Sequence, residues 1–212
     1  MEHQRSSEEQ GAVPVRKRLI IASNNAGKLR EFKELLEPYG FDVISMREAG
    51  FNEEIVEDGD TFEENAHIKA RAVFEATGEP TIADDSGLEI DFLGGAPGVY
   101  SARYAGEGAT DKDRCKKVLD EMHGVEHELR EARFVCTIYF IYAEDDEYSV
   151  RGEVNGYIGD KPHGKNGFGY DPIFMVNEDE SMADLDEEEK HKISHRAVAF
   201  GKLSEILKEK FS

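Results

Sequence analysis

The sequence that decides the fold is Thr81-Ile82-Ala83-Asp84-Asp85-Ser86-Gly87-Leu88, in which a short apolar run leads into two carboxylates, a hydroxyl and a glycine. The apolar residues on either side predict two short strands, with the acidic pair in a turn between them. Paired carboxylates where a strand ends can hold a hard cation such as Mg²⁺, and the glycine permits a sharp turn and close approach of a ligand. Because such a tetrapeptide is also typical of ordinary polar turns, its meaning depends on residues 23–31, 168–171 and 190–196.

Composition bounds the size and the partners of the protein. The 212 residues, 39% hydrophobic and 34% charged, predict a folded chain of one large domain or two packed lobes. The 46 acidic residues against 26 basic ones give a net charge of -20. Such a surface repels nucleic-acid backbones and anionic membranes, so we expect neither as a partner. A polyanionic substrate would then need a local basic pocket or a metal.

Cysteine usage and the N-terminus indicate the compartment. Cys115 and Cys136 have no C-x-x-C spacing, which argues against a zinc site or a redox pair. A reduced, cytoplasmic setting is the simpler expectation. No run approaches the roughly 18 apolar residues of a membrane span. Residues 1–17 lack the apolar segment of a secretory signal, and we expect them to form a disordered tail.

The first half of the chain alternates strand and helix patterns. Two helix starts carry a capping box, Thr61 with Glu64 and Thr110 with Asp113. Gly40 is a typical helix stop. We expect strands over residues 19–22 and 41–44, and helices over residues 26–39, 61–77 and 110–122.

The second half is richer in strands. Residues 134–142 and 148–158 predict an antiparallel hairpin. The remaining segments are expected to be a glycine-rich loop, a strand, an acidic solvated stretch and an amphipathic helix, over residues 161–169, 172–176, 178–190 and 194–211 respectively. The fold class is therefore α/β, with a central sheet that carries both parallel and antiparallel strands.

The first strand leads into Ser23-Asn24-Asn25-Ala26-Gly27-Lys28, which predicts an anion site. A helix N-terminus offers free backbone N–H groups and a favourable dipole to an anion. Lys28 in the first turn is unfavourable there unless an anion compensates its charge. The spacing is not that of a Walker P-loop. The alternative is an ordinary capped turn with an exposed lysine.

Two later segments carry chemistry suited to a base. Phe168-Gly169-Tyr170-Asp171 offers an aromatic face for stacking and a carboxylate for hydrogen bonds. Within residues 190–196, Ser194 is the predicted N-cap of the last helix. His195 and Arg196 then lie in its first turn, where cations are unfavourable unless they face a ligand. The alternatives are a β-turn with core aromatics and a solvated basic cluster.

Six motifs in order resemble the inosine triphosphate pyrophosphatase family. They are S-N-N-A-G-K-L-R-E, T-F-E-E-N-A-x-x-K-A, A-D-D-S-G-L, G-G-A-P-G-V-Y-S-A-R-Y, G-F-G-Y-D-P-I-F and K-x-x-I-S-H-R, spread from Arg18 to Phe211. The resemblance implies an elongated mixed β-sheet flanked by helices, in one domain over residues 18–212 with two lobes around a central cleft. It also implies a homodimer and Mg²⁺-dependent hydrolysis of inosine, deoxyinosine and xanthosine triphosphates to the monophosphate and pyrophosphate.

The resemblance also implies roles for single residues. Asp85 corresponds to the family's general base and metal ligand. Glu57 is the candidate for a second metal ligand, with Glu53, Glu54 and Glu64 as competitors. Lys69 is a candidate phosphate contact. The residues expected to bind substrate are Ser23, Asn24, Asn25, Ala26, Gly27, Lys28, Ser86, Phe168, Gly169, Tyr170, Asp171, Lys190, His195 and Arg196.

Selectivity would follow from hydrogen-bond donors. Inosine and xanthosine carry a 6-keto acceptor where adenine carries an amino donor, and Arg196 or a protonated His195 can only donate. Two other functions stay open. A septum-inhibitor-type pyrophosphatase would prefer pyrimidine or modified triphosphates, and the F-G-Y-D and S-H-R segments argue against it. A non-catalytic nucleotide-binding module is disfavoured because Asp84 and Asp85 are both present.

Overall fold

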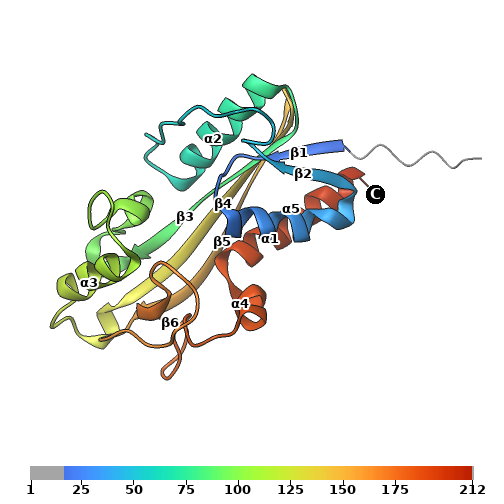
Figure 1. Cartoon of the computed structure of the whole chain (residues 1–212). Coiled ribbons are helices and arrows are strands. Elements are labelled where there is room, and N and C mark those ends of the chain that lie inside the picture. Colours follow the sequence, from blue (N-terminus) through green and yellow to red (C-terminus); the bar gives the residue numbers. More distant parts are fainter. Residues whose placement is uncertain (1–16, 212) are drawn as a thin grey trace, which may run out of the picture.

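The fold is built on one mixed six-stranded sheet with strand order β2-β1-β3-β4-β5-β6 (Figure 1). The computed structural model describes residues 17–211. β1 is parallel to β2 and to β3, whereas β3, β4, β5 and β6 are joined by antiparallel pairing. The predicted α/β class with a mixed sheet is confirmed. The strands are β1 (Lys17–Ile21), β2 (Phe41–Ser45), β3 (Thr81–Ile90), β4 (Glu131–Ala143), β5 (Asp146–Ile158) and β6 (Phe174–Met175).

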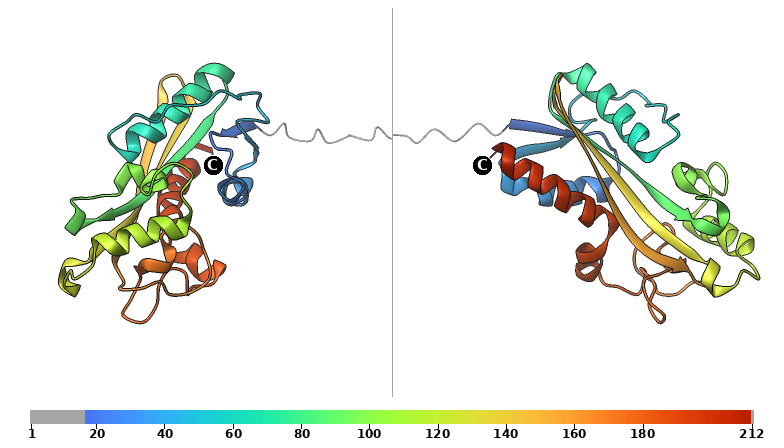
Figure 2. Two further views of the ribbon diagram at one scale, coloured as in Figure 1. Left: turned by 60° about the vertical axis from the view of Figure 1, so that its left-hand side comes forward. Right: turned by 180° about the vertical axis from the view of Figure 1, so that it is seen from behind.

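Helices cover both faces of this sheet (Figure 2). Along β4, Ile138 and Phe140 pack with α1 and α5, whereas Tyr139 and Ile141 pack with α2. Alternate residues of a strand point to opposite faces, so α2 covers one face and the α1–α5 pair covers the other. A further apolar cluster joins α3 to the far ends of β3 and β4. The helices are α1 (Ala26–Leu36), α2 (Phe62–Thr77), α3 (Asp111–Glu121), α4 (Glu187–Ile193) and α5 (His195–Phe211).

Both predicted capping boxes are confirmed, at Thr61 with Glu64 and at Thr110 with Asp113. The helix predicted over residues 26–39 is shorter. It is α-helical only to Leu36 and continues as a 3₁₀ helix, Glu37–Tyr39. Pro38 lacks the N–H that an α-helix needs, so the last turn tightens. The chain then leaves through Gly40 at φ 75°, as predicted.

The acidic pair does not lie in a turn, and this prediction was wrong. β3 is one continuous strand, Thr81–Ile90, and each of its residues pairs with a residue of β4. The residues of the predicted turn favour a turn locally, but the long pairing with β4 keeps them extended. Cross-strand contacts decide strand structure more than local preference does. Gly87 has a packing role instead, since a Cβ there would lie 2.4 Å from Ser101 Oγ and 2.9 Å from Phe62.

The second half also departs from the prediction in places. The hairpin is confirmed, but its strands are longer and its turn is tighter than expected. Only part of residues 172–176 forms the predicted strand, because the 3₁₀ helix Asp171–Ile173 precedes the short β6. The acidic stretch is not wholly solvated, because Ser181, Met182 and Ala183 are buried and α4 begins at a capping box on Asp186. Apolar packing and a local cap therefore order a segment whose charge suggested otherwise.

The structure also defines where the first strand and the last helix begin. Ser194 caps the last helix as predicted, accepting a hydrogen bond from the Ala197 amide at 3.1 Å. The predicted tail lies outside the described residues except for Lys17, which is the first residue of β1 and was wrongly assigned to the tail. Among residues 17–211, no helix is long and apolar enough to cross a membrane.

The central part of β3 has an open edge. β1 pairs with β3 only at Thr81 and Ile82, and the loop that follows Leu93 closes the edge again from Leu88 onward. Within the described residues, no strand pairs with this side of β3 between those positions. The alternation that aims the Ile82 carbonyl at β1 also aims the amides of Asp84 and Ser86 at the open edge. The fold thus leaves the backbone beside the acidic pair without a strand partner among residues 17–211.

Candidate functional site

The two carboxylates of the acidic pair lie on opposite faces of the sheet. Asp84 faces α1 and α5, where Lys28 Nζ is 2.8 Å from its Oδ2 and Arg196 Nε is 3.8 Å from the same oxygen. Asp85 faces α2, where Lys69 Nζ is 3.4 Å from its Oδ1. Successive residues of a strand point to opposite sides, so this separation follows from β3 being continuous.

Asp84 is a buried counter-ion, with 2% of the residue exposed. Burial would raise the pKa of its carboxyl, but the charges of Lys28, Arg196 and Lys69 outweigh burial and lower the pKa to about 2. Asp84 is therefore ionised at neutral pH and balances cations from two helices. A carboxylate surrounded in this way is suited to holding basic groups in place rather than to accepting a proton.

Asp85 has the opposite electrostatics. Burial raises the pKa of its carboxyl, and the nearby Glu57 carboxylate acts in the same direction, although Lys69 opposes both. Lys69 Nζ also lies 2.7 Å from Glu57 Oε2, so the ammonium bridges the two carboxylates. Burial works against the charge of Lys69, but Asp85, Asp84 and Glu57 together raise its pKa. The bridge is therefore charged at neutral pH.

Of the predicted metal ligands, Glu57 and Asp85 lie close together, on either side of Lys69. Within residues 17–211, no three His, Cys, Asp or Glu side chains form a group that could hold a metal ion. Mg²⁺ is commonly held by one or two carboxylates, with water and substrate phosphates completing its shell, so the pair fits that ion. Glu64 is engaged elsewhere, accepting the amides of Asp60 and Thr61. Glu53 is exposed on the preceding loop.

The predicted anion loop joins β1 to α1, and its amides are only partly free. The Asn25 side chain accepts from the amides of Gly27 and Lys28 at 2.9 and 3.1 Å, and Ser23 Oγ accepts from the Asn25 amide. Asn24 and Ala26 are exposed on the same loop. The expectation that its N–H groups are unoccupied is thus wrong for the amides of Asn25, Gly27 and Lys28, because the side chains of Ser23 and Asn25 accept their hydrogen bonds.

The predicted base segment forms a second cluster. The Phe168 side chain is exposed, and Lys190 Nζ lies 4.5 Å from the centre of its ring. Asp171 is buried, and its Oδ2 accepts from Lys190 Nζ at 2.5 Å and from the Phe168 amide at 2.8 Å. That oxygen therefore holds the loop together. The Tyr170 hydroxyl is also turned inward and donates to the Ser101 carbonyl at 2.7 Å.

His195 and Arg196 are both buried in the first turn of α5. The ring of His195 stacks on Phe134, with 5.1 Å between centroids, and its Nδ1 has no hydrogen-bond partner among the described residues. Burial, with Arg196 and Lys190 nearby, lowers the pKa of His195 to about 3. The histidine is neutral at pH 7, so the protonated form considered from sequence is not populated.

Arg196 has a partner that the sequence did not indicate. Its guanidinium lies 3.0 Å from Glu31 Oε2 on α1, and Glu31 Oε1 is 3.5 Å from His191. Glu31 lies 165 positions away from Arg196 along the chain. No local motif marks such a pair, although Glu31 faces the same side of α1 as Lys28, three residues earlier.

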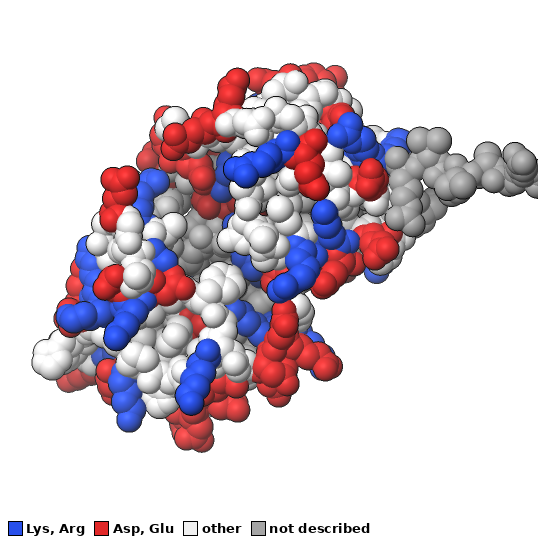
Figure 3. All heavy atoms as spheres, in the orientation of Figure 1, with Lys and Arg blue, Asp and Glu red and all other residues white. Residues whose placement is uncertain are grey.

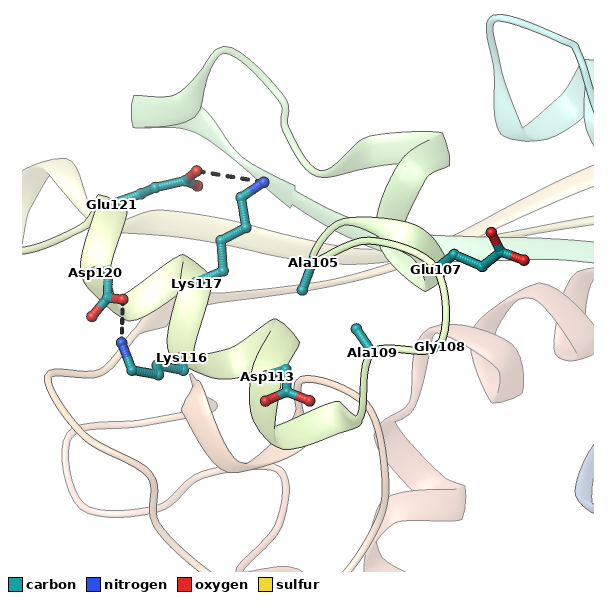
Figure 4. A pocket seen from close by; sticks show the side chains of 9 residues that line it. All are labelled: Ala105, Glu107, Gly108, Ala109, Asp113, Lys116, Lys117, Asp120 and Glu121. Carbon is teal, nitrogen blue, oxygen red and sulfur yellow. Dashed lines mark hydrogen bonds and ion pairs between the residues drawn. The ribbon is translucent and has the colours of Figure 1, made fainter.

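The predicted residues thus lie on both faces of the sheet beside the open edge of β3. Figure 3 shows acidic side chains over much of the surface and a hollow between the part formed by α1 and α2 and the part formed by α3. A separate cavity of about 620 Å³ lies between residues 105–109 and α3 (Figure 4). Its lining holds both signs of charge, including Lys117 and Glu121, and none of the predicted site residues. The candidate site is therefore the region beside the open edge of β3.

Known proteins resemble this chain over most of its length. The Ham1 family model matches residues 19–206. The chain is 55% identical to a dITP/XTP pyrophosphatase of Bacillus subtilis (strain 168), over 91% of this chain and 98% of that protein. It is 48% identical to the dITP/XTP pyrophosphatase of Vibrio cholerae, with the same shares covered.

Solved structures give the same result. The Staphylococcus aureus Ham1 protein superposes with a TM-score of 0.86 at 42% identity, covering 92% of this chain and all of that one. A Ham1 protein from Coxiella burnetii gives 0.86 at 43% identity, covering 91% and 99%. Because the family model, the relatives and the solved structures agree over nearly the whole described chain, this protein belongs to the Ham1 family.

Proposed function

We propose that this protein is a Mg²⁺-dependent pyrophosphatase that hydrolyses non-standard purine nucleoside triphosphates. The substrates are inosine, deoxyinosine and xanthosine triphosphates, and the products are the monophosphate and pyrophosphate. The observation that carries the proposal is the Glu57–Lys69–Asp85 bridge at the open edge of β3, with Lys28 and Arg196 on the other face. The names of the relatives support the substrate class.

Asp85 is the proposed general base. Its raised pKa makes it a better proton acceptor than Asp84, whose pKa is lowered. The water oxygen bonds to the α-phosphorus, the α–β anhydride bond breaks with its electrons on pyrophosphate, and the water proton passes to Asp85. Mg²⁺, held by Asp85 and Glu57, would neutralise phosphate charge and orient the water. The Lys69 ammonium offsets the negative charge that develops on the phosphate oxygens.

The phosphate and base ends of the substrate are proposed to meet different clusters. Lys28 supports phosphate binding, and the exposed Phe168 ring offers a stacking face whose orientation Asp171 maintains. Arg196 donates toward a 6-keto oxygen, and neutral His195 presents one donor and one acceptor nitrogen. Adenine would leave a buried donor unpaired, and sites built on such a bond reject analogues by factors of order 10⁴ in favourable cases.

The domain, assembly and location are proposed with it. The continuous strands β3 and β4 contact apolar clusters at both ends of the sheet, which supports one two-lobed domain over residues 18–212. The family resemblance supports a homodimer, which light scattering at several concentrations would test. The buried free thiols Cys115 and Cys136 suit the reducing cytoplasm, which fractionation of the source cells would test.

Pyrophosphate release in the presence of Mg²⁺ tests the activity directly. The panel contains inosine, deoxyinosine and xanthosine triphosphates beside adenosine, guanosine and pyrimidine triphosphates. We expect the first three to be hydrolysed fastest and chelation of the metal to stop the reaction. Preference for pyrimidine nucleotides would identify a septum-inhibitor-type enzyme. Binding without release would identify a non-catalytic module.

A further inference from the structure

Gly169, in the base segment, is hydrogen-bonded to α3 through both its amide and its carbonyl oxygen. The Gly169 amide donates to Asp111 Oδ2 at 2.8 Å, and the Cys115 thiol donates to the Gly169 carbonyl oxygen at 3.3 Å. Asp111 and Cys115 are four residues apart, so both hydrogen bonds to Gly169 come from the same face of α3. Gly169 adopts φ 62°, a left-handed conformation that side chains rarely allow.

Asp111 is itself fixed. Arg114, in the same turn of α3, donates to the Asp111 carboxylate and to the carbonyls of Ala102 and Ala109. Burial acts to raise the pKa of Asp111, but the bond from the Gly169 amide and the charge and hydrogen bond of Arg114 outweigh it. The carboxylate is therefore ionised, and hydrogen bonds to an ionised acceptor are stronger than neutral ones.

The other side of the loop is tied to β3. The Tyr170 hydroxyl donates to the Ser101 carbonyl at 2.7 Å, and Ser101 Oγ accepts the Leu88 amide at 2.9 Å. Leu88 lies two residues beyond Ser86 on the strand that carries the acidic pair. The loop is thus clamped between α3 and β3, while the ring of Phe168 stays exposed at its tip.

On the basis of the proposed function, we propose that Asp111 is a positioning residue for purine recognition. It does not touch the nucleotide. It fixes the peptide that follows Phe168, so that the ring is presented to the base without an ordering cost at the moment of binding. Release of the Gly169 amide would let the loop sample other conformations and weaken binding of the base while leaving the phosphate contacts intact.

The test compares two substitutions of Asp111 with a matched control in the same helical turn. Asp111→Ala removes the bond to Gly169, and Asp111→Asn keeps an amide oxygen that can still accept it. Asp113→Ala is the control, because the Asp113 carboxylate caps α3 through Thr110 and, within residues 17–211, makes no hydrogen bond to the loop. Two dissociation constants are measured, for inosine monophosphate and for tripolyphosphate, which has no base, together with KM and kcat for inosine triphosphate.

For Asp111→Ala we expect about tenfold weaker binding of inosine monophosphate and a similar rise in KM, the effect of one lost hydrogen bond to a charged group. Tripolyphosphate binding and kcat should stay within about twofold of the parent, since phosphate contacts are untouched. Asp111→Asn should fall between Asp111→Ala and the parent, and Asp113→Ala should bind both ligands as the parent does.

The inference is overturned if Asp111→Ala weakens tripolyphosphate as much as inosine monophosphate, or if it behaves like Asp113→Ala. If Asp111→Ala does not fold, Asp111→Asn is compared with Asp113→Asn instead. The deciding quantity is again the loss of affinity for inosine monophosphate relative to the loss of affinity for tripolyphosphate. The proposed function is judged separately, by pyrophosphate release from the unsubstituted protein. An active parent with unchanged nucleotide binding in both Asp111 variants refutes only the positioning role.

Discussion

The burial of His195 predicts a sharp loss of stability in mild acid. The pKa of this histidine is about 3 in the folded protein against an ordinary 6.5. Below pH 6.5 the unfolded chain binds a proton that the folded chain refuses, so acid favours unfolding. The part of the stability that depends on neutral His195 is fully present above pH 6.5 and is lost as the pH falls toward 3. His195→Gln removes the titrating group and keeps a polar side chain at the start of α5.

The magnitude follows from proton linkage. From about pH 7.5 to about pH 5, this one residue should lower the free energy of unfolding by about 2 kcal/mol. The figure depends almost entirely on the unfolded chain, because a group with a pKa near 3 takes up little proton at that pH. Carboxylates that also titrate contribute equally to parent and variant, so they cancel in the comparison.

Urea unfolding followed by circular dichroism, at both pH values, measures the effect. The parent should lose about 2 kcal/mol more than His195→Gln over this interval. His123→Gln is the matched control, because His123 is exposed and its replacement should leave the pH dependence of the parent unchanged. If the parent and His195→Gln lose equal stability, the histidine is not held neutral by burial and the reasoning fails.

Three further substitutions test other parts of the structure. Asp85→Asn should lower kcat at least a hundredfold, in line with general-base losses of about 10²–10⁴, while nucleotide binding stays measurable by calorimetry; turnover within a few-fold of the parent would contradict the role. Arg130→Met should cost about 3 kcal/mol or more in urea unfolding, since the buried guanidinium donates to four backbone carbonyls; a loss below about 1 kcal/mol would refute this. Thr137→Val should leave stability unchanged or raise it by up to about 1 kcal/mol, because the buried hydroxyl has no hydrogen-bond partner within residues 17–211; a clear loss would mean that it has one.

Features encoded by a few neighbouring residues were predictable from sequence. The capping boxes at Thr61 and Thr110, the stop at Gly40 and the cap at Ser194 are examples, because each depends on residues within one helical turn. The hairpin was predictable for a similar reason, since its strands are long and adjacent in sequence. The box on Asp186 was missed because the charge around it suggested a solvated stretch.

Contacts between distant segments could not be predicted. Glu31 with Arg196 and Asp111 with Gly169 are separated by 165 and 58 positions, and their pairing depends on how α1, α3 and α5 pack on the sheet. The same limit explains the error at β3. Its turn-forming residues are held extended by ten consecutive partners in β4, which no local preference reveals.

The continuity of β3 explains how two adjacent aspartates can take different roles. In a turn, Asp84 and Asp85 would share one environment, and their pKa values would move together. In a strand they face opposite sides. The cations of α1 and α5 outweigh burial at Asp84 and lower its pKa, whereas at Asp85 burial and the Glu57 carboxylate outweigh Lys69 and raise the pKa. Environments that separate the pKa values of two carboxylates allow one of them to act as the proton acceptor. The proposed general base, Asp85, therefore lies on the α2 side of β3, whereas Asp84 lies on the other side, beside Lys28 and Arg196.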